Sequence, residues 1–201
     1  MQTAVGAGAP QRPPFGFSLT APAGWRPLRI DTGRDEEVLA AFTATPAWRD
    51  GDEEVRDGLR LLAEAALGAH DRAGVLASWV RAADEPLLAP RVLTLTWIRT
   101  APALADEFSA TVVLARGRRT RVGPHAAVVQ DSHARAGHLR SQQVAVPLPG
   151  SVWIALLTLT SSGEPSPGLD TGSDAGLDAG LDAGLDTDLV AAAASLRRLA
   201  A

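Results

Sequence analysis

Three side chains near the middle of the chain are of the types that bind metal ions or transfer protons. His125, Asp131 and His133 are separated by even numbers of residues, so on an unbroken strand they share one face, whereas His138 lies on the other. Imidazole and carboxylate groups are common zinc ligands and acid–base catalysts. The polar residues and the glycine among them argue against an unbroken strand. We therefore expect surface histidines and no metal site, and we retain a small hydrolase or metal-binding enzyme using this region as the alternative.

The tripeptide Asp131-Ser132-His133 contains the residue types of a serine-hydrolase triad. Adjacent residues on an extended chain point to opposite faces, whereas a triad needs its side chains hydrogen-bonded in series. The sequence also has no Gly-x-Ser-x-Gly elbow, no phosphate-binding glycine loop and no His-Glu-x-x-His motif. It therefore predicts no catalytic residue and no cofactor.

A basic cluster contains four arginines: Arg116, Arg118, Arg119 and Arg121. Guanidinium groups match phosphate and carboxylate oxygens, so the cluster could bind nucleic acid or an acidic protein. No aromatic residue lies within the cluster to stack on bases, and the chain carries a net charge of -4. We therefore expect no nucleic-acid binding. The cluster is expected to form a solvated turn between strands, and it is the leading candidate for contact with a protein partner.

The composition is that of a globular protein that contains no cysteine. The 201 residues are 46% hydrophobic and 21% charged, and none is cysteine, which excludes disulfides, thiolate nucleophiles and cysteine-ligated metals. Apolar runs such as Val152–Leu157 are far shorter than the roughly 20 residues that a membrane-spanning helix needs. The first residues lack the pattern of a signal peptide. We expect a cytoplasmic protein with no membrane insertion, and the composition indicates no particular oligomeric state.

Hydrophobic patterning predicts the strands that must position these residues. Strands are expected at 15–21, 25–30, 74–82, 92–98, 118–122, 126–130, 139–146 and 151–160. Three of them, 74–82, 92–98 and 151–160, are apolar on both faces. Such strands are typical of the interior of a sheet, so we expect these three to be interior strands of one sheet.

Two longer helices are predicted, at 34–47 and 50–69. The second begins with Asp50 and Glu53 at the spacing of a capping box. Its apolar residues form one stripe, consisting of Val55, Leu59, Leu62, Ala63, Ala66 and Leu67. This stripe predicts an amphipathic helix packed on the sheet.

A shorter helix is predicted after the strand at 92–98. Thr100-Ala-Pro102 is typical of a helix start, with threonine as the N-cap and proline near the first turn. Leu104 and Phe108 are four residues apart and would share one side of the helix. We expect the helix to end before or within Ala110–Leu114.

The whole chain is predicted to be an α+β protein with a mostly antiparallel sheet flanked by helices in a single domain. Residues 1–14 are expected to be a flexible segment, and 15–162 form the α+β domain. Within 163–186, Gly, Leu, Asp and Ala recur with a period of four, which indicates a flexible low-complexity insertion. Residues 187–201 are expected to form a C-terminal helix that docks on the domain, because a lone short helix is marginal in water.

Both ends of the domain carry sequence that resembles a known family. The segment Phe17-Ser-Leu-Thr-Ala-Pro-Ala-Gly-Trp25 is similar to the F-x-L-x-x-P-x-G-W pattern of PsbP-like α/β/α sandwich proteins. The segment Val146–Thr160 and the terminal helix with Ser195-Leu196 resemble small actinobacterial proteins of that type. Members of the group are binding or assembly proteins without a shared catalytic site. The resemblance therefore implies a non-enzymatic binding or accessory protein that acts through protein–protein contacts.

Overall fold

The protein consists of one large sheet with helices on both sides. The computed structural model describes residues 12–28, 35–73, 75–81, 91–100, 104–133, 139–162 and 185–199. The elements are β1 (Phe17–Ser18), β2 (Trp25–Leu28), α1 (Asp35–Thr43), α2 (Pro46–Asp50), α3 (Glu53–Ala73), β3 (Ala77–Arg81), β4 (Arg91–Arg99), α4 (Glu107–Val113), β5 (Arg118–Val122), β6 (His125–His133), β7 (Leu139–Pro147), β8 (Trp153–Ser162), α5 (Thr187–Ser195) and β9 (Arg197–Arg198).

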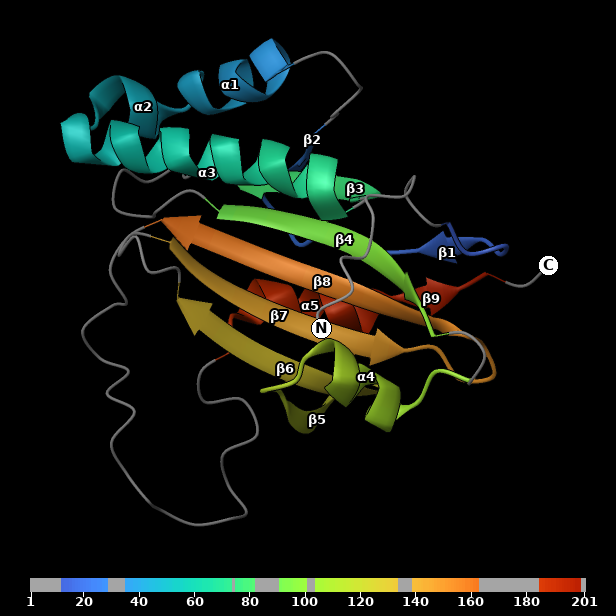
Figure 1. The fold of residues 1–201 in the computed structure, drawn as a ribbon. Helices are drawn as coiled ribbons and strands as arrows, with labels where there is room; N and C mark the ends of the chain where they lie inside the picture. Colours follow the sequence, from blue (N-terminus) through green and yellow to red (C-terminus); the bar gives the residue numbers. More distant parts are fainter. Residues whose placement is uncertain are drawn as a thin grey trace, which may run out of the picture.

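Seven strands form the large sheet, in the order β2-β3-β4-β8-β7-β6-β5, and β1 pairs with β9 in a small second sheet. Every strand pair in the described part of the chain is antiparallel. Figure 1 shows α1 to α4 on one side of the large sheet and α5 on the other. The predicted fold class is confirmed: a mostly antiparallel sheet flanked by helices, with a helix near the C-terminus. The three strands expected inside the sheet, now β3, β4 and β8, are indeed interior.

Alternation along the central strands gives the large sheet two different faces. On β4, Leu93 and Leu95 belong to the apolar core under α5, whereas Thr94 lies on the opposite side with α3. The register of β4 and β8 places Leu95 beside Leu157 and Thr94 beside Thr158, so both strands follow the same division. We refer to these two sides as the α5 face and the α3 face.

The α5 face carries the largest apolar core. The buried residues that α5 and its C-cap contribute are Leu189, Ala192, Ala193 and Leu196. They pack on side chains of the central strands, among them Trp97 and Leu157, which are also buried. The expectation that this helix docks on the domain is therefore confirmed. The helix is shorter than the predicted 187–201, because it ends at Ser195 and Arg197–Arg198 form strand β9.

The N-terminal end of α5 is held by charged groups as well as by packing. Asp186 is the N-cap residue, and its Oδ1 accepts a hydrogen bond from the Asp188 backbone N–H at 2.9 Å. Asp186 also forms an ion pair with Arg91 of β4, and Asp188 forms one with Arg81 of β3. These contacts fix the helix at its start, where the carboxylates also complement the helix dipole.

On the opposite side, α3 buries the predicted stripe against the sheet. Leu59, Leu62 and Ala63 are fully buried there. The cap differs from the prediction, because Asp50 closes α2 and Asp52 caps α3, accepting a hydrogen bond from the Val55 N–H at 3.0 Å. Two short helices therefore replace the single helix expected at 34–47, which shifts the start of α3 by a few residues.

The start of α4 also differs from the prediction. Asp106, not Thr100, is the N-cap residue, and its carboxylate accepts a hydrogen bond from the Ser109 N–H at 2.7 Å. The Thr100 N–H and hydroxyl instead donate to the Val152 carbonyl, which extends the pairing of β4 with β8. Within α4, Ala110 is buried against the sheet, whereas Phe108 points to solvent. Of the predicted pair, only Phe108 belongs to the helix, and it lies on the outer side, whereas Leu104 precedes the N-cap residue.

The two ends of the described chain lie side by side. Phe17 of β1 pairs with Arg198 of β9, and the rings of Phe15 and Phe17 contact Trp97 edge-on at 6.0 and 5.0 Å. No helix in the described ranges is long and apolar enough to cross a membrane. The residues 1–11 of the predicted flexible segment and 163–184 of the predicted repeat lie outside the described residues.

Candidate functional site

The histidine region lies on β6, which is a continuous strand from His125 to His133. The argument against an unbroken strand is therefore wrong, and His125 and Asp131 share the α5 face as their spacing predicts. Six residues of extended strand place them about 20 Å apart along the chain direction. The side chain of His133 and all of His138 lie outside the described residues. In the described part of the molecule, no three His, Cys, Asp or Glu side chains are grouped so that they could hold a metal ion.

His125 is engaged in a structural contact. Its Nε2 lies 2.9 Å from the backbone carbonyl oxygen of Leu196, so the neutral ring donates a hydrogen bond to the end of α5. Burial lowers the pKa of His125 below its usual value near 6.5; the hydrogen bond to Leu196 opposes this shift, and the charge of Arg197 adds to it. The imidazole is therefore held neutral, in a position where it fastens α5 to β6.

Asp131 is engaged in a second structural contact. It forms an ion pair with Arg140 of β7, whose Nε lies 3.2 Å from Oδ2 and 3.3 Å from Oδ1. Hydrogen bonding to Asp131 raises the pKa of Arg140. The Gln142 amide nitrogen also approaches Asp131 Oδ2 at 3.3 Å, and its Oε1 accepts from the Asp186 N–H at 2.8 Å. Asp131 thus belongs to a network that supports the start of α5.

The basic cluster lies on the outer strand of the large sheet. β5 pairs with β6 and is the last strand in the sheet order, so the prediction of a strand at 118–122 is confirmed. The expectation that the arginine cluster forms a turn is therefore wrong, because three of its four arginines belong to this strand. Arg118, Arg119 and Arg121 are all exposed. The register places Arg118 on the α5 face and Arg119 and Arg121 on the α3 face. Arg116 precedes the strand, and its backbone N–H approaches the Gln130 side-chain oxygen at 3.4 Å.

An exposed apolar stripe lies on the α3 face, the face to which Arg119 and Arg121 belong. Phe108 and Val112 lie on the outer side of α4, and Leu104 precedes its N-cap residue; the three side chains are 67%, 67% and 61% exposed. α4 packs on β5, β6 and β7. Hydrogen bonds from Ser109 lower the pKa of Asp106, and the charge of Arg119 contributes a smaller lowering. We call the stripe together with Arg116, Arg118, Arg119 and Arg121 the α4–β5 surface.

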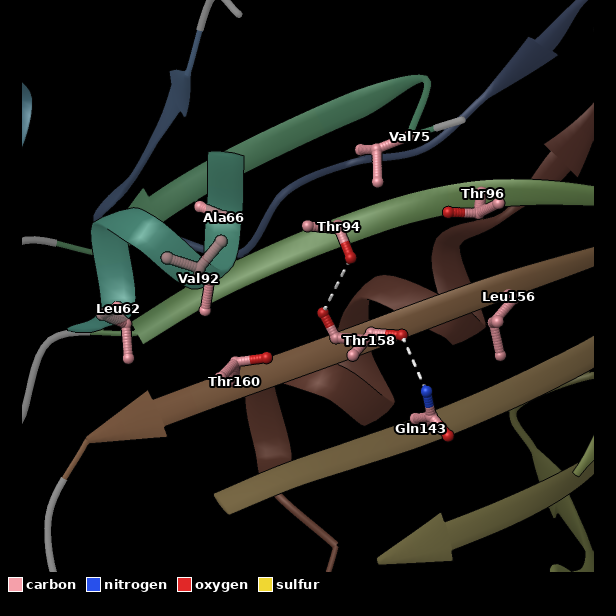
Figure 2. A pocket seen from close by; sticks show the side chains of 11 residues that line it. Leu62, Ala66, Val75, Val92, Thr94, Thr96, Gln143, Leu156, Thr158 and Thr160 are labelled. Atoms are coloured by element: carbon pink, nitrogen blue, oxygen red, sulfur yellow. Dashed lines mark hydrogen bonds between the residues drawn. The ribbon is translucent and has the colours of Figure 1, made fainter. Parts of the chain in front are cut away.

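A second candidate site is a pocket of about 180 Å³ on the α3 face. Its polar lining consists of Thr94, Thr96, Gln143, Thr158 and Thr160. Its apolar lining consists of Leu62, Ala65, Ala66, Val75, Val92 and Leu156. Figure 2 shows Thr94, Thr158 and Gln143 in a row across the neighbouring strands β4, β8 and β7. The pocket therefore has a hydrogen-bonding floor and an apolar wall to which α3 contributes.

The polar groups of this floor are only loosely bonded to the protein. The Thr94 hydroxyl donates to the Thr158 carbonyl, and the Gln143 amide donates to the Thr158 hydroxyl, both at 3.5 Å (Figure 2). For Thr96 and Thr160, no side-chain hydrogen bond exists to any other described residue. Hydrogen bonds of ordinary strength are about 0.5 Å shorter. The floor thus has hydrogen-bonding capacity that the protein does not use.

Sequence reasoning missed this pocket, although a signal was present. In the segments 92–98 and 153–160 the threonines alternate with large apolar residues, so they all fall on one side of a strand. We interpreted both segments as apolar on both faces, because threonine is also a common strand former. Only the register, which places two threonine-bearing strands next to each other, gathers the hydroxyls into one floor.

Comparisons with known proteins place few limits on function. No protein-family model matches the chain, and no curated protein matches it. A solved structure from Bacteroides thetaiotaomicron VPI-5482 is similar to it with a TM-score of 0.42 and 8% sequence identity. The match covers 92% of this chain but 45% of the other, so the chain spans less than half the length of that protein. A likeness at this level carries no argument about what the protein does.

Proposed function

We propose that this protein is a non-enzymatic binding protein, and that its α4–β5 surface binds an acidic, partly apolar segment of a partner protein. The observation that carries the proposal is a set of three exposed arginines on an edge strand, of which Arg119 and Arg121 lie on the same face of the sheet as an exposed apolar stripe. Such a surface offers guanidinium groups for carboxylates and an apolar strip for the side chains between them.

The apolar stripe is the unusual part of this surface. Single exposed apolar residues are ordinary, but Phe108 and Val112 share the outer side of one short helix and the exposed Leu104 comes just before its N-cap. Contiguous apolar surface with a polar rim is typical of protein interaction sites. The neighbouring arginines supply such a rim, and rim charges mainly set the rate of encounter and the choice of partner.

Two further observations support a binding role over a catalytic one. His125 and Asp131 lie far apart on β6, and each has a structural partner, Leu196 and Arg140 respectively. The resemblance of both chain ends to PsbP-like proteins favours the same class of function, because the members of that group are binding or assembly proteins. The resemblance supports a binding function, and the α4–β5 surface supports the place where the partner would bind.

The test uses a fluorescent twelve-residue peptide in which glutamate alternates with leucine, and a matched peptide with lysine in place of glutamate. Arg118→Glu, Arg119→Glu and Arg121→Glu are combined in one variant. Fluorescence anisotropy should show binding of the acidic peptide to the native protein, at least tenfold weaker binding to the triple variant, and a steep loss of affinity with added salt.

The controls separate recognition from other roles of charge. Arginine on an edge strand also discourages pairing between sheets, and the glutamates of the variant preserve that protection. Arg26→Glu, at an exposed position on the opposite edge strand β2, should leave peptide binding unchanged. Equal binding of the lysine peptide, or undiminished binding by the triple variant, would remove the proposal. Phe108→Ser should weaken binding without changing its salt dependence.

A further inference from the structure

We propose that the pocket on the α3 face binds an uncharged polyhydroxy ring, the chemistry of a single sugar or cyclic polyol. This site is separate from the α4–β5 surface, and the inference does not depend on the function proposed for that surface. Three properties of the pocket carry it: the unused hydrogen-bonding capacity of the floor, the apolar wall opposite, and a lining without charge.

The floor favours a ligand that carries several hydroxyl groups. Hydroxyls of Thr96 and Thr160 and the amide oxygen of Gln143 have no side-chain hydrogen bond to another described residue. A hydroxyl both donates and accepts, so an array of threonines is matched best by a ligand whose groups also do both. These three residues are partly exposed, so their polar groups can reach a ligand that enters the pocket.

The wall favours a ligand with a carbon-rich side. Leu62 and Ala66 of α3, together with Val92 and Leu156 of the sheet, line the pocket beside the threonines (Figure 2). A sugar ring presents hydroxyls around its rim and C–H groups on its faces. It can therefore satisfy the floor and cover the apolar wall at the same time, which a uniformly polar or uniformly apolar molecule cannot do.

Charge and size exclude other ligand classes. None of the described residues that line the pocket is charged, so a phosphate or carboxylate would lose water without gaining a counter-ion. An acyl chain would leave the threonine hydroxyls unpaired. Pockets for drug-sized ligands occupy about 300–1,000 Å³. The volume of about 180 Å³ therefore suits one ring.

The experiment is saturation-transfer NMR on the full chain, which detects weak binding without a label. The probes are glucose, galactose, mannose and myo-inositol, with glucose 6-phosphate as the charged comparison and cyclohexanol as the apolar one. We expect signal from at least one of the four uncharged polyhydroxy probes, and a signal at least tenfold weaker from the two comparison compounds.

Three variants locate the binding. Thr96→Val with Thr160→Val removes two hydroxyls while keeping the side-chain shape, and should weaken binding tenfold or more. Ala65→Phe fills the pocket from α3 and should abolish binding, whereas Thr20→Val, at an exposed position outside the pocket lining, should leave it unchanged. Unaltered melting temperatures establish that each variant is folded. No signal from any of the four probes, equal signal from the charged or apolar compound, or binding that survives both pocket variants would overturn the inference.

Discussion

The two faces of the large sheet are closed in different ways. On the α5 face, large apolar side chains of the strands meet a helix whose inner side is fully buried, and ion pairs from β3 and β4 hold the start of that helix. On the α3 face, α3 and α4 cover separate regions of the sheet, with buried apolar clusters under each. The threonine-floored pocket also opens on this face, beside α3.

The difference shows how one sheet can serve two purposes. The alternation of side chains lets the same strand contribute Leu95 to a dense core and Thr96 to a pocket, one residue apart. Stability can therefore be concentrated on the α5 face, while the other face retains polar groups that contribute little to folding. Each of the following variants tests this difference between the two faces.

The largest effect is expected from Leu196→Ala. Leu196 is fully buried in the core of the α5 face, so its truncation leaves a cavity and should destabilise the protein by about 2–5 kcal/mol. Chemical denaturation of both proteins measures the difference. Leu199→Ala is the control, because Leu199 is 49% exposed and its loss should cost less than about 0.5 kcal/mol. Equal costs for the two variants would show that the α5 face does not dominate stability.

A smaller effect is expected from Asp186→Ala, which removes the N-cap of α5 and the ion pair with Arg91. Loss of a cap costs about 1–2 kcal/mol. Asp186→Asn retains an oxygen that can accept from the Asp188 N–H, so it should recover most of that stability and lose only the charge contribution. Thermal unfolding monitored by circular dichroism distinguishes them, and identical melting temperatures for the two variants would contradict a capping role.

A pH-dependent effect is expected from His125. Its pKa is lowered in the folded protein, so below about pH 6.5 the unfolded chain binds the proton first and stability falls as pH decreases. His125→Gln can still donate to the Leu196 carbonyl but does not titrate. The difference in free energy of unfolding between the native protein and this variant should therefore be constant above pH 7 and change below it. A difference that stays constant down to pH 5 would contradict the burial of the neutral ring.

The smallest effect is expected from Thr96→Val with Thr160→Val. These hydroxyls have no side-chain hydrogen bond to another described residue, so the free energy of unfolding should change by less than about 0.5 kcal/mol. Thr45→Val is the contrasting control. The Thr45 hydroxyl is buried and donates to the Phe42 carbonyl at 2.7 Å, so its loss should cost about 1–3 kcal/mol. If the two changes cost the same, the pocket threonines support the fold.

The sequence was sufficient for the elements with strong periodicity. The stripe of α3 was predicted because six apolar residues repeat at helical spacing, and the interior strands because their apolar runs are short and β-branched. The cap was harder, since Asp50 has Glu53 at the capping-box spacing, whereas Asp52, which caps α3, has Val55 at that spacing. Only the turn between α2 and α3 decides between them.

The candidate sites depended on information that a single sequence does not contain. The prediction that Leu104 and Phe108 share one side of a helix is wrong for Leu104, because α4 begins at Glu107. For Phe108, periodicity cannot tell whether its side of the helix faces the sheet or the solvent. The small residue Ala110 faces the sheet because α4 lies close to it. The pocket required the pairing of β4 with β8, which joins segments about sixty residues apart.

The position of α5 in the chain has a consequence for biosynthesis. Synthesis proceeds from the N-terminus, so β8 is complete at Ser162 before α5 begins at Thr187. Until that helix leaves the ribosome, the apolar side chains of Leu93, Leu95 and Leu157 lack the cover that α5 gives them, and exposed surface of this kind promotes aggregation and chaperone binding. The nascent chain is therefore most vulnerable in the interval between the completion of its sheet and the arrival of its last helix.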